Sequence, residues 1–379
     1  MKKSILIVSG IFLSLILLIP TSCKLDIGAP SSMRFSAELT IIDTSVNNQD
    51  SLVSSSNVIL QSITFGDEFE AITNEEGKVI FHDLLPDSYN ILATGNRVDG
   101  AEIILINGQV QDTSLFIENN DTLKLKVITQ VSKSSALLIS EIYYTGAKTS
   151  IPQYFHDQFI EFYNNSLQVV YLDSLLIANV EYGFVDEPLI HATHAYMFPG
   201  TGNDFPIQPG ELVVVARNAI DHSPRPVYSV NLLNADFEYY RSDIGDVDNP
   251  TAVNMVKLHS KYANDFMYSV FNNALLLLNV QNPFENGYDE FNRILLPKNS
   301  VIDGVEYRDN PAEIYMKRID SSIDGGLTGG IASYSSQSVE RKIDRWEGDR
   351  MILMDNNNSS LDFKINKPPT PGLIEEVTE

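Results

Sequence analysis

The sequence predicts an all-β protein built from two β-sandwich domains. Short runs of Val, Ile, Leu, Phe and Tyr recur between clusters of Asn, Asp and Gly, which is the spacing of strands and turns. No stretch keeps a 3.6-residue apolar period for more than three turns, so long helices are not expected. A polar segment at 130–135 separates two strand-rich regions and predicts the boundary between the domains.

Composition limits the possible partners. The chain has 379 residues, with 50 Asp and Glu against 26 Lys and Arg, and a formal net charge of −24. Such an acidic chain is not expected to bind nucleic acid, because phosphate backbones are bound by basic surfaces. With one Cys in the chain a disulfide framework is excluded, and a metal site would have to use His and carboxylates.

The N-terminus has the pattern of an export signal. Basic residues at 1–3 precede an apolar run, 5–19, whose fifteen residues reach only about 22 Å as a helix, short of the ~30 Å of a bilayer core. The run is followed by Pro20-Thr21-Ser22-Cys23. A small residue directly before a Cys at this place resembles the lipobox of bacterial lipoproteins, although Pro20 stands where that family usually has Leu.

The lipobox resemblance implies a signal peptide over 1–22, lipidation of Cys23 and a linker over 23–34. It also implies a lipoprotein that meets the membrane through its lipid anchor. We therefore expect an outer-membrane location, on the periplasmic or the cell-surface face. The alternative is an ordinary cleaved signal that happens to end near the lone Cys23.

The first domain is predicted from alternation and from one turn. Apolar and polar residues alternate over 57–61 and 78–82, as in half-buried strands. Asn74 and Gly77 predict a hairpin turn, because Asn caps its own turn and Gly supplies the positive φ. Tyr89 is placed to pack at the following corner. Residues 73–89 resemble the T-[ND]-x-x-G and L-x-P-x-x-Y pattern of the carboxypeptidase regulatory-like (transthyretin-like) β-sandwich, which implies an accessory domain over 35–130.

The second region resembles the lamin-tail domain, an Ig-like β-sandwich, over 135–374. Its strands are expected at 157–163, 211–216 and 274–280, of which the last two are continuous enough to be covered on both faces. The resemblance is carried by 138–144, 158–165, 170–175, 209–214, 302–305, 338–341, 355–363 and Thr370-Pro371-Gly372. This copy is enlarged by insertions near 181–206 and 218–272, which we expect to form loops. Together with the lipobox, the two domains resemble an uncharacterised family of Bacteroidota lipoproteins.

Candidate metal ligands are few. His191 and His194 are three residues apart and His222 lies downstream, a set that zinc could use with a carboxylate, although the HExxH motif is absent. The segment from Asp355 to Asp362 alternates oxygen-bearing residues like a calcium loop, but it lacks the Gly and Glu that an EF-hand needs. We therefore expect turns rather than metal sites and no cofactor, with calcium as the alternative at the acidic loops.

Other motifs carry structure rather than chemistry. The chain has no G-x-S-x-G, and the glycine-rich run 325–330 lacks the Lys of a phosphate-binding loop. We interpret that run as a flexible hairpin tip. Glu161 is expected on the strand face of Phe159, away from Ile160. Arg341, in a late strand, is a candidate ion-pair partner for Glu161.

The combined features favour a non-catalytic binding or scaffold protein at the cell surface, with a glycan or a protein as its unknown ligand. Accessory-type sandwiches place their binding residues on the loops at the sandwich ends. The alternative is a metal-dependent hydrolase that uses the loop His and Asp residues.

Overall fold

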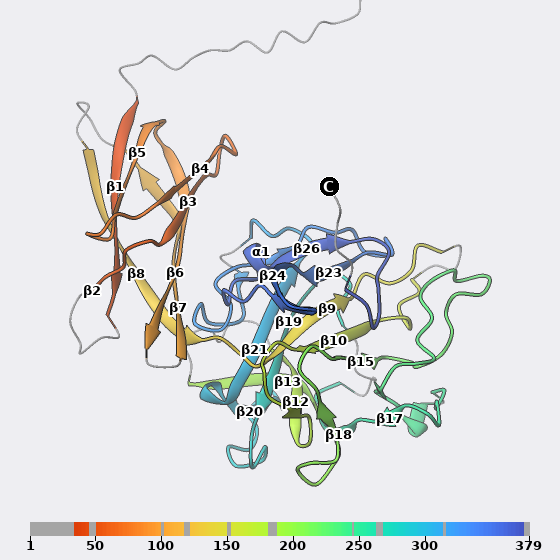
Figure 1. Ribbon diagram of the computed structural model, residues 1–379. Coiled ribbons are helices and arrows are strands. Elements are labelled where there is room, and N and C mark those ends of the chain that lie inside the picture. The colour runs from red at the N-terminus through yellow and green to blue at the C-terminus, as the bar shows by residue number, and fades with distance from the viewer. Residues whose placement is uncertain are drawn as a thin grey trace, which may run out of the picture.

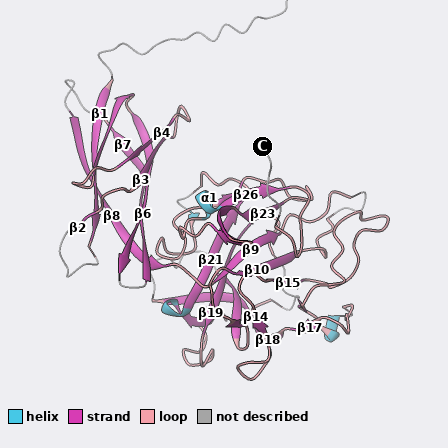
Figure 2. Ribbon diagram, in the orientation of Figure 1, coloured by secondary structure: helices cyan, strands magenta, loops and turns pink. Residues whose placement is uncertain are grey.

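The predicted all-β class is confirmed. The computed structural model describes residues 34–44, 51–99, 102–116, 122–149, 153–180, 188–244, 246–262, 268–313 and 316–374. Strands form nearly all of the regular structure (Figure 2). Within these ranges there is one α-helix, the four-residue α1 (Ser359–Asp362). Two short 3₁₀ helices are also present, η2 (Ser242–Ile244) and η3 (Lys298–Ser300).

Eight strands form an N-terminal body, coloured red to yellow in Figure 1. They are β1 (Phe35–Asp43), β2 (Ser51–Leu52), β3 (Asn57–Ser62), β4 (Glu68–Ile72), β5 (Lys78–Leu84), β6 (Asp87–Asp99), β7 (Glu102–Leu115) and β8 (Thr122–Lys133). Strand β8 pairs in parallel with β1 up to Thr129 and antiparallel with β7 from Gln130, so it joins the two halves of the sheet around one apolar core. Residues 130–133, expected in a polar linker, are the end of this strand.

The turn around Asn74 forms as predicted, but it does not close a hairpin. The Asn74 side chain accepts hydrogen bonds from the backbone N–H of Glu76 (2.9 Å) and Lys78 (3.0 Å), and Gly77 has a φ of +64°. The flanking strands pair elsewhere, β4 with β3 and β5 with β1, so the turn carries the chain from one half of the sheet to the other. Tyr89 packs in the core, and its hydroxyl donates to Leu85 O at 2.8 Å, which confirms the expected corner.

The C-terminal body contains two seven-stranded sheets. Sheet I has the order β17 (Val253–Asn254), β16 (Phe237–Glu238), β15 (Leu212–Ala216), β10 (Phe159–Asn164), β9 (Leu137–Tyr143), β23 (Ser338–Arg341) and β26 (Phe363–Asn366). Sheet II has the order β18 (Val256–Ser260), β13 (Leu189–Met197), β12 (Leu175–Val180), β19 (Asn272–Asn279), β21 (Val301–Arg308) and β22 (Thr328–Gly329), with β20 (Ile294–Pro297) on β13. Two small ribbons pair β11 (Val170–Tyr171) with β14 (Pro206–Ile207) and β24 (Ile343–Glu347) with β25 (Arg350–Leu353).

The main core lies between sheets I and II. Ile160 and Phe162 of β10 face Leu275 and Leu277 of β19 across it. The even-numbered residues of β19, such as Leu276, pack in a second core on the far side of sheet II. Strands β15 and β19 are therefore covered on both faces, as their continuous apolar runs predict.

The two insertions are not the loops that we expected. Residues 181–206 supply β13 and the first residue of β14, and residues 218–272 supply β16, β17 and β18. These strands lengthen both sheets at one end, so the enlargement is an extension of the sandwich. Apolar alternation in such short strands is too brief to distinguish them from loops by sequence.

Three buried glutamates lie side by side on the outer face of sheet I. Glu161, Glu141 and Glu340 occupy adjacent strands in register, and each is fully inaccessible to solvent. The C-terminal segment covers them, since Gly372 N donates to Glu161 at 2.6 Å and Thr370 N donates to Glu141 at 3.2 Å. Burial raises the pKa of Glu141 to about 7 and also raises the pKa of Glu161.

The predicted pair between Glu161 and Arg341 is wrong. Glu161 does share the face of Phe159, as expected, and that is the outer face. Arg341 lies on the opposite face of the sheet with Val339, because residues two apart in a strand point the same way. It reaches toward sheet II, where Asp303 Oδ2 lies 2.9 Å from its Nη2.

Arg341 is held by more than one acid. Asp362 Oδ2 and Asp355 Oδ1 lie 3.3 Å and 3.7 Å from its Nη1, and its Nε donates to Ile139 O at 3.0 Å. Burial raises the pKa of Asp303 and that of Asp362, the latter to about 7. Arg341 opposes this rise, but one guanidinium does not balance the charge of three carboxylates.

Replacing Arg341 tests this buried network. Arg341→Met should lower the free energy of unfolding by about 3–5 kcal/mol, because it leaves buried carboxylates without a cation. The control Arg345→Ala removes a half-exposed arginine and should cost less than about 1 kcal/mol. Urea unfolding followed by far-UV circular dichroism measures both. A loss below about 1 kcal/mol for Arg341→Met would contradict the central role of the network.

The glutamate row predicts a pH dependence of stability. A carboxyl whose pKa is higher in the folded state favours folding at low pH, and the advantage disappears as pH rises through its folded pKa. For Glu141 this occurs between about pH 4.5 and pH 7 and amounts to about 3 kcal/mol. Between pH 5 and pH 8 the wild type should therefore lose more stability than Glu141→Gln. Glu75→Gln, on an exposed turn, should follow the wild type; parallel curves for all three would refute the assignment.

Candidate functional site

The acidic segment 355–362 contacts Arg341 and the N-terminal body. Asp355 and Asp362 both point at Arg341, as described above. Asn356 O accepts a hydrogen bond from Asn107 Nδ2 of β7 at 2.6 Å. Asn357, whose φ is +47°, donates to Ser132 Oγ of β8 at 2.7 Å. The alternation that resembles a calcium loop is therefore explained by protein partners on both sides.

The three candidate histidines lie in two separate places. His191 and His194 are in strand β13, not in a loop. His191 Nδ1 is 2.7 Å from Asp289 Oδ2, whereas His194 Nδ1 is 3.1 Å from Thr193 Oγ1. His222 is buried near sheet I, with its Nδ1 2.6 Å from the Tyr154 hydroxyl, and burial lowers its pKa.

No metal centre assembles in the part of the chain that the structure describes. Within it, no three His, Cys, Asp or Glu side chains come close enough to hold an ion. Cys23, with the signal peptide 1–22, lies outside the described residues. None of the described helices is long and apolar enough to cross a bilayer.

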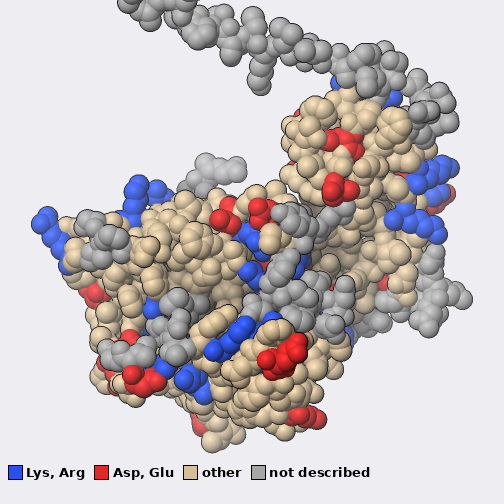
Figure 3. All heavy atoms as spheres, turned by 180° about the vertical axis from the view of Figure 1, so that it is seen from behind, with Lys and Arg blue, Asp and Glu red and all other residues tan. Residues whose placement is uncertain are grey.

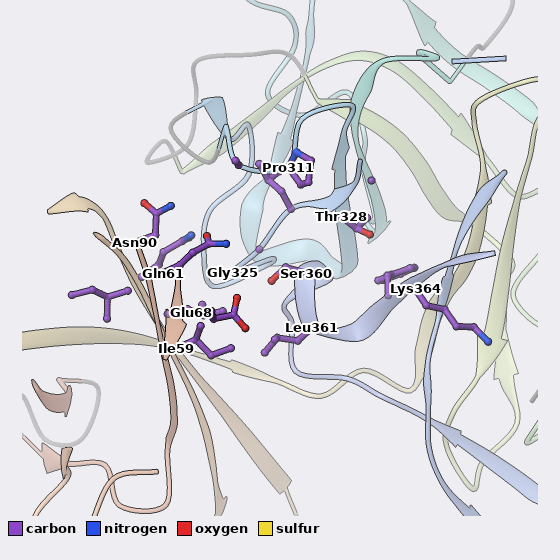
Figure 4. A pocket seen from close by; sticks show the side chains of 18 of the residues that line it. Ile59, Gln61, Glu68, Asn90, Pro311, Gly325, Thr328, Ser360, Leu361 and Lys364 are labelled. Atoms are coloured by element: carbon purple, nitrogen blue, oxygen red, sulfur yellow. The ribbon is translucent and has the colours of Figure 1, made fainter. Parts of the chain in front are cut away.

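A groove of about 480 Å³ lies between the two bodies (Figure 4). The sequence did not indicate it, because its two walls are more than 200 residues apart in the chain. Strands β3, β4, β6 and β7 form one wall. Helix α1, strand β26 and the glycine-rich run 325–329 form most of the other.

The N-terminal wall is the outer face of a sheet. Val58 and Leu60 of β3 point into the core, so the intervening Ile59 and the next residue, Gln61, point out. Cross-strand register places Leu92 beside Ile59, Asn90 beside Gln61, and Gln109 beside Leu92. The wall therefore presents three amide side chains around a small aliphatic centre.

The opposite wall contains the glycine-rich run, which is not a flexible tip. Residues 325–328 are buried, and a Cβ on Gly326 would lie 2.7 Å from Ser360 N. The carboxylate of Asp324 fixes this segment, because its Oδ1 accepts from Gly326 N (3.0 Å) and from Ser359 N (2.7 Å). The buried Lys317 Nζ donates to Gly326 O at 2.6 Å. Glycine is needed here for close packing of backbone on backbone.

The groove is nearly neutral in an acidic protein. Among the described lining residues, Glu68 and Lys364 are the charged ones, and Lys364 Nζ is already 2.9 Å from Glu340 Oε2. The aromatic ring that lines it, that of Phe363, is buried. On the face of the molecule shown in Figure 3, acidic and basic side chains are interspersed. The groove is thus suited to an uncharged ligand with many hydrogen-bonding groups.

Part of the chain is similar to a known protein family. A model of the family "Protein of unknown function (DUF4876)" matches residues 208–370. The crystal structure of a DUF4876 family protein from Bacteroides thetaiotaomicron is similar, with a TM-score of 0.58, 22% identity, and coverage of 89% of this chain and 96% of that one. At this identity the likeness shows the fold. No curated protein sequence gave a significant match.

Two further solved structures are less similar. A candidate adhesin from Bacteroides ovatus is 15% identical, with a TM-score of 0.20 over 59% of this chain and 87% of that one. The shaft pilin SpaA from Lactobacillus rhamnosus GG is 9% identical, with a TM-score of 0.18 over 78% and 97%.

Proposed function

We propose that the protein is an exported, lipid-anchored binding protein without catalytic activity, and that it holds its ligand in the groove between its two bodies. The observation that carries this proposal is the construction of the groove. One wall is the outer face of a hydrogen-bonded sheet and the other contains the buried, hydrogen-bonded run 325–328, and the two bodies are joined beside the groove by Asn356 and Asn357. A site that is formed before the ligand arrives loses little entropy on binding.

The proposed location rests on the N-terminal sequence. The apolar run 5–19 followed by Ser22-Cys23 supports export and lipidation of Cys23. The partners would then be the outer membrane, through the acyl chains, and a glycan or protein ligand on the periplasmic or cell-surface side. Two or three acyl chains give stable anchoring, where one gives marginal binding.

The finer family assignments belong to the same proposal. The turn at Asn74 and the corner at Tyr89 support a carboxypeptidase regulatory-like domain over 35–130. The Thr370-Pro371-Gly372 segment, which bonds to Glu141 and Glu161, supports a lamin-tail-like domain over 135–374. The alternative, a metal-dependent hydrolase, has no observation in its favour, since its histidines have separate partners.

Lipid anchoring predicts a change in location on mutation. Cys23→Ala should move the protein from the membrane fraction to the soluble fraction, because the acyl chains have no other attachment point. Ser22→Ala keeps a small residue before the Cys and should leave the protein in the membrane. Fractionation followed by immunoblotting measures both, and a Cys23→Ala variant that still requires detergent for extraction would refute the anchor.

If the groove is the binding site, ligand affinity should depend on the amide wall, the N-terminal wall that carries Gln61, Asn90 and Gln109. We expect a member of a glycan array or of a phage-displayed library of linear peptides to bind the soluble protein. Gln61→Ala with Gln109→Ala should weaken that binding by about tenfold or more, which calorimetry measures. Gln130→Ala, on exposed β8 outside the groove, is the matched control. Binding that is unchanged in the double variant, or no binder in either collection, would contradict the proposal.

A further inference from the structure

The groove contains the end of both sheets of the C-terminal body. Strand β26 is the last strand of sheet I, and β22 is the last strand of sheet II. Residues of both strands line the groove. Figure 4 shows Thr328 of β22 and Lys364 of β26 near Ser360 and Leu361 of the helix. The end of a sheet is where a further strand can be added.

Register shows which backbone groups of β26 face outward. Lys342 N donates to Asp362 O at 2.7 Å, and β23 then pairs Glu340 with Lys364 and Val339 with Ile365. Hydrogen-bonded and non-hydrogen-bonded pairs alternate along an antiparallel ladder. Ile365 therefore belongs to a non-hydrogen-bonded pair, and its N–H and C=O point away from β23. Its side chain is 52% exposed.

The facing wall complements an extended chain. Gln61 and Gln109 carry both donors and acceptors, which match the N–H and C=O groups of a polypeptide backbone, and Asn90 adds its Nδ2 donor, since its Oδ1 accepts from Asp112 N at 3.2 Å. Leu361 and the largely buried Leu327 are apolar residues of the opposite wall. An oligosaccharide site would be expected to expose an aromatic ring for stacking, and the described lining does not.

We propose that the groove binds an extended, uncharged polypeptide segment of a partner protein by adding it to sheet I along the open edge of β26. The segment pairs with the N–H and C=O of Ile365 and receives side-chain hydrogen bonds from the amide wall. Alternate residues of the segment place apolar side chains against Leu327 and Leu361. This inference rests on the proposed function, because it names what the groove holds.

The test uses linear peptides selected by phage display against the soluble full-length chain after the signal, with Cys23→Ala in every protein. Ile365→Pro removes the outward N–H and no ladder bond, since proline is tolerated at such an edge position. We expect it to weaken peptide binding by about tenfold or more in calorimetry. Ile365→Val keeps the N–H and the branched side chain and should bind like the wild type.

A second measurement does not depend on the folding of the proline variant. Each peptide bond of the selected peptide is N-methylated in turn and tested against unmodified Ile365. Strand addition predicts a loss at the one peptide bond whose N–H meets Ile365 O and none at the peptide bonds on either side of it, because their N–H groups point away from β26 and the Phe363 N–H is already bonded to Ser359 O. Equal losses at adjacent peptide bonds, or no loss at any of them, would overturn the inference. A glycan that binds through Gln61 and Gln109, and that no peptide displaces, would overturn the strand-addition inference but leave the proposed function intact. If no ligand binds in the groove, both the inference and the proposed function are wrong.

Discussion

The arrangement of the C-terminal body depends on one buried cation, Arg341. It extends from sheet I into the space between the sheets, donates to a carbonyl of β9 and meets Asp303 on sheet II. Asp303 also accepts from Ile139 N at 2.7 Å, so the pair links the sheets through backbone and side chain together. The remaining acids, Asp355 and Asp362, flank the turn that holds the N-terminal body. The packing of the two sheets and the contact between the two bodies therefore both involve the charge of Arg341.

The outer face of sheet I carries the glutamate row formed by Glu161, Glu141 and Glu340. The glutamate row places three carboxyls side by side: Lys364 pairs with Glu340, whereas Glu141 and Glu161 are covered by hydrogen bonds from the chain end. Ser338 and Ser140 hydroxyls donate to Glu141 and Glu161 respectively. Raised pKa values are the physical result, because a buried carboxyl without a cation holds its proton more tightly. Sheet I thus has a cluster of acids around Arg341 on its inner face and a row of glutamates bonded mainly to backbone and hydroxyl groups on its outer face.

Local features were predictable from sequence, and partners across the fold were not. Alternation identified β3, β5 and β10, and the Asn74 turn and Tyr89 corner depend only on neighbouring residues. The partner of Arg341 depends on which face residue 341 occupies and on which strand lies opposite, and neither follows from local pattern. The groove was missed for the same reason, since Gln61 and Gly326 meet only through the packing of two bodies. The glycine run was misjudged because glycine permits close packing as readily as flexibility.

The inter-body contacts have a consequence for the order in which the molecule is completed. Asn107 and Ser132 receive their partners from Asn356 and Asn357, which leave the ribosome more than 200 residues later. Because synthesis starts at the N-terminus, the N-terminal body is complete long before these partners are made. The N-terminal wall of the groove has no opposite wall until α1 and β26, near the end of the chain, have been synthesised. The proposed ligand would meet only half of its site until synthesis of the C-terminal body is complete.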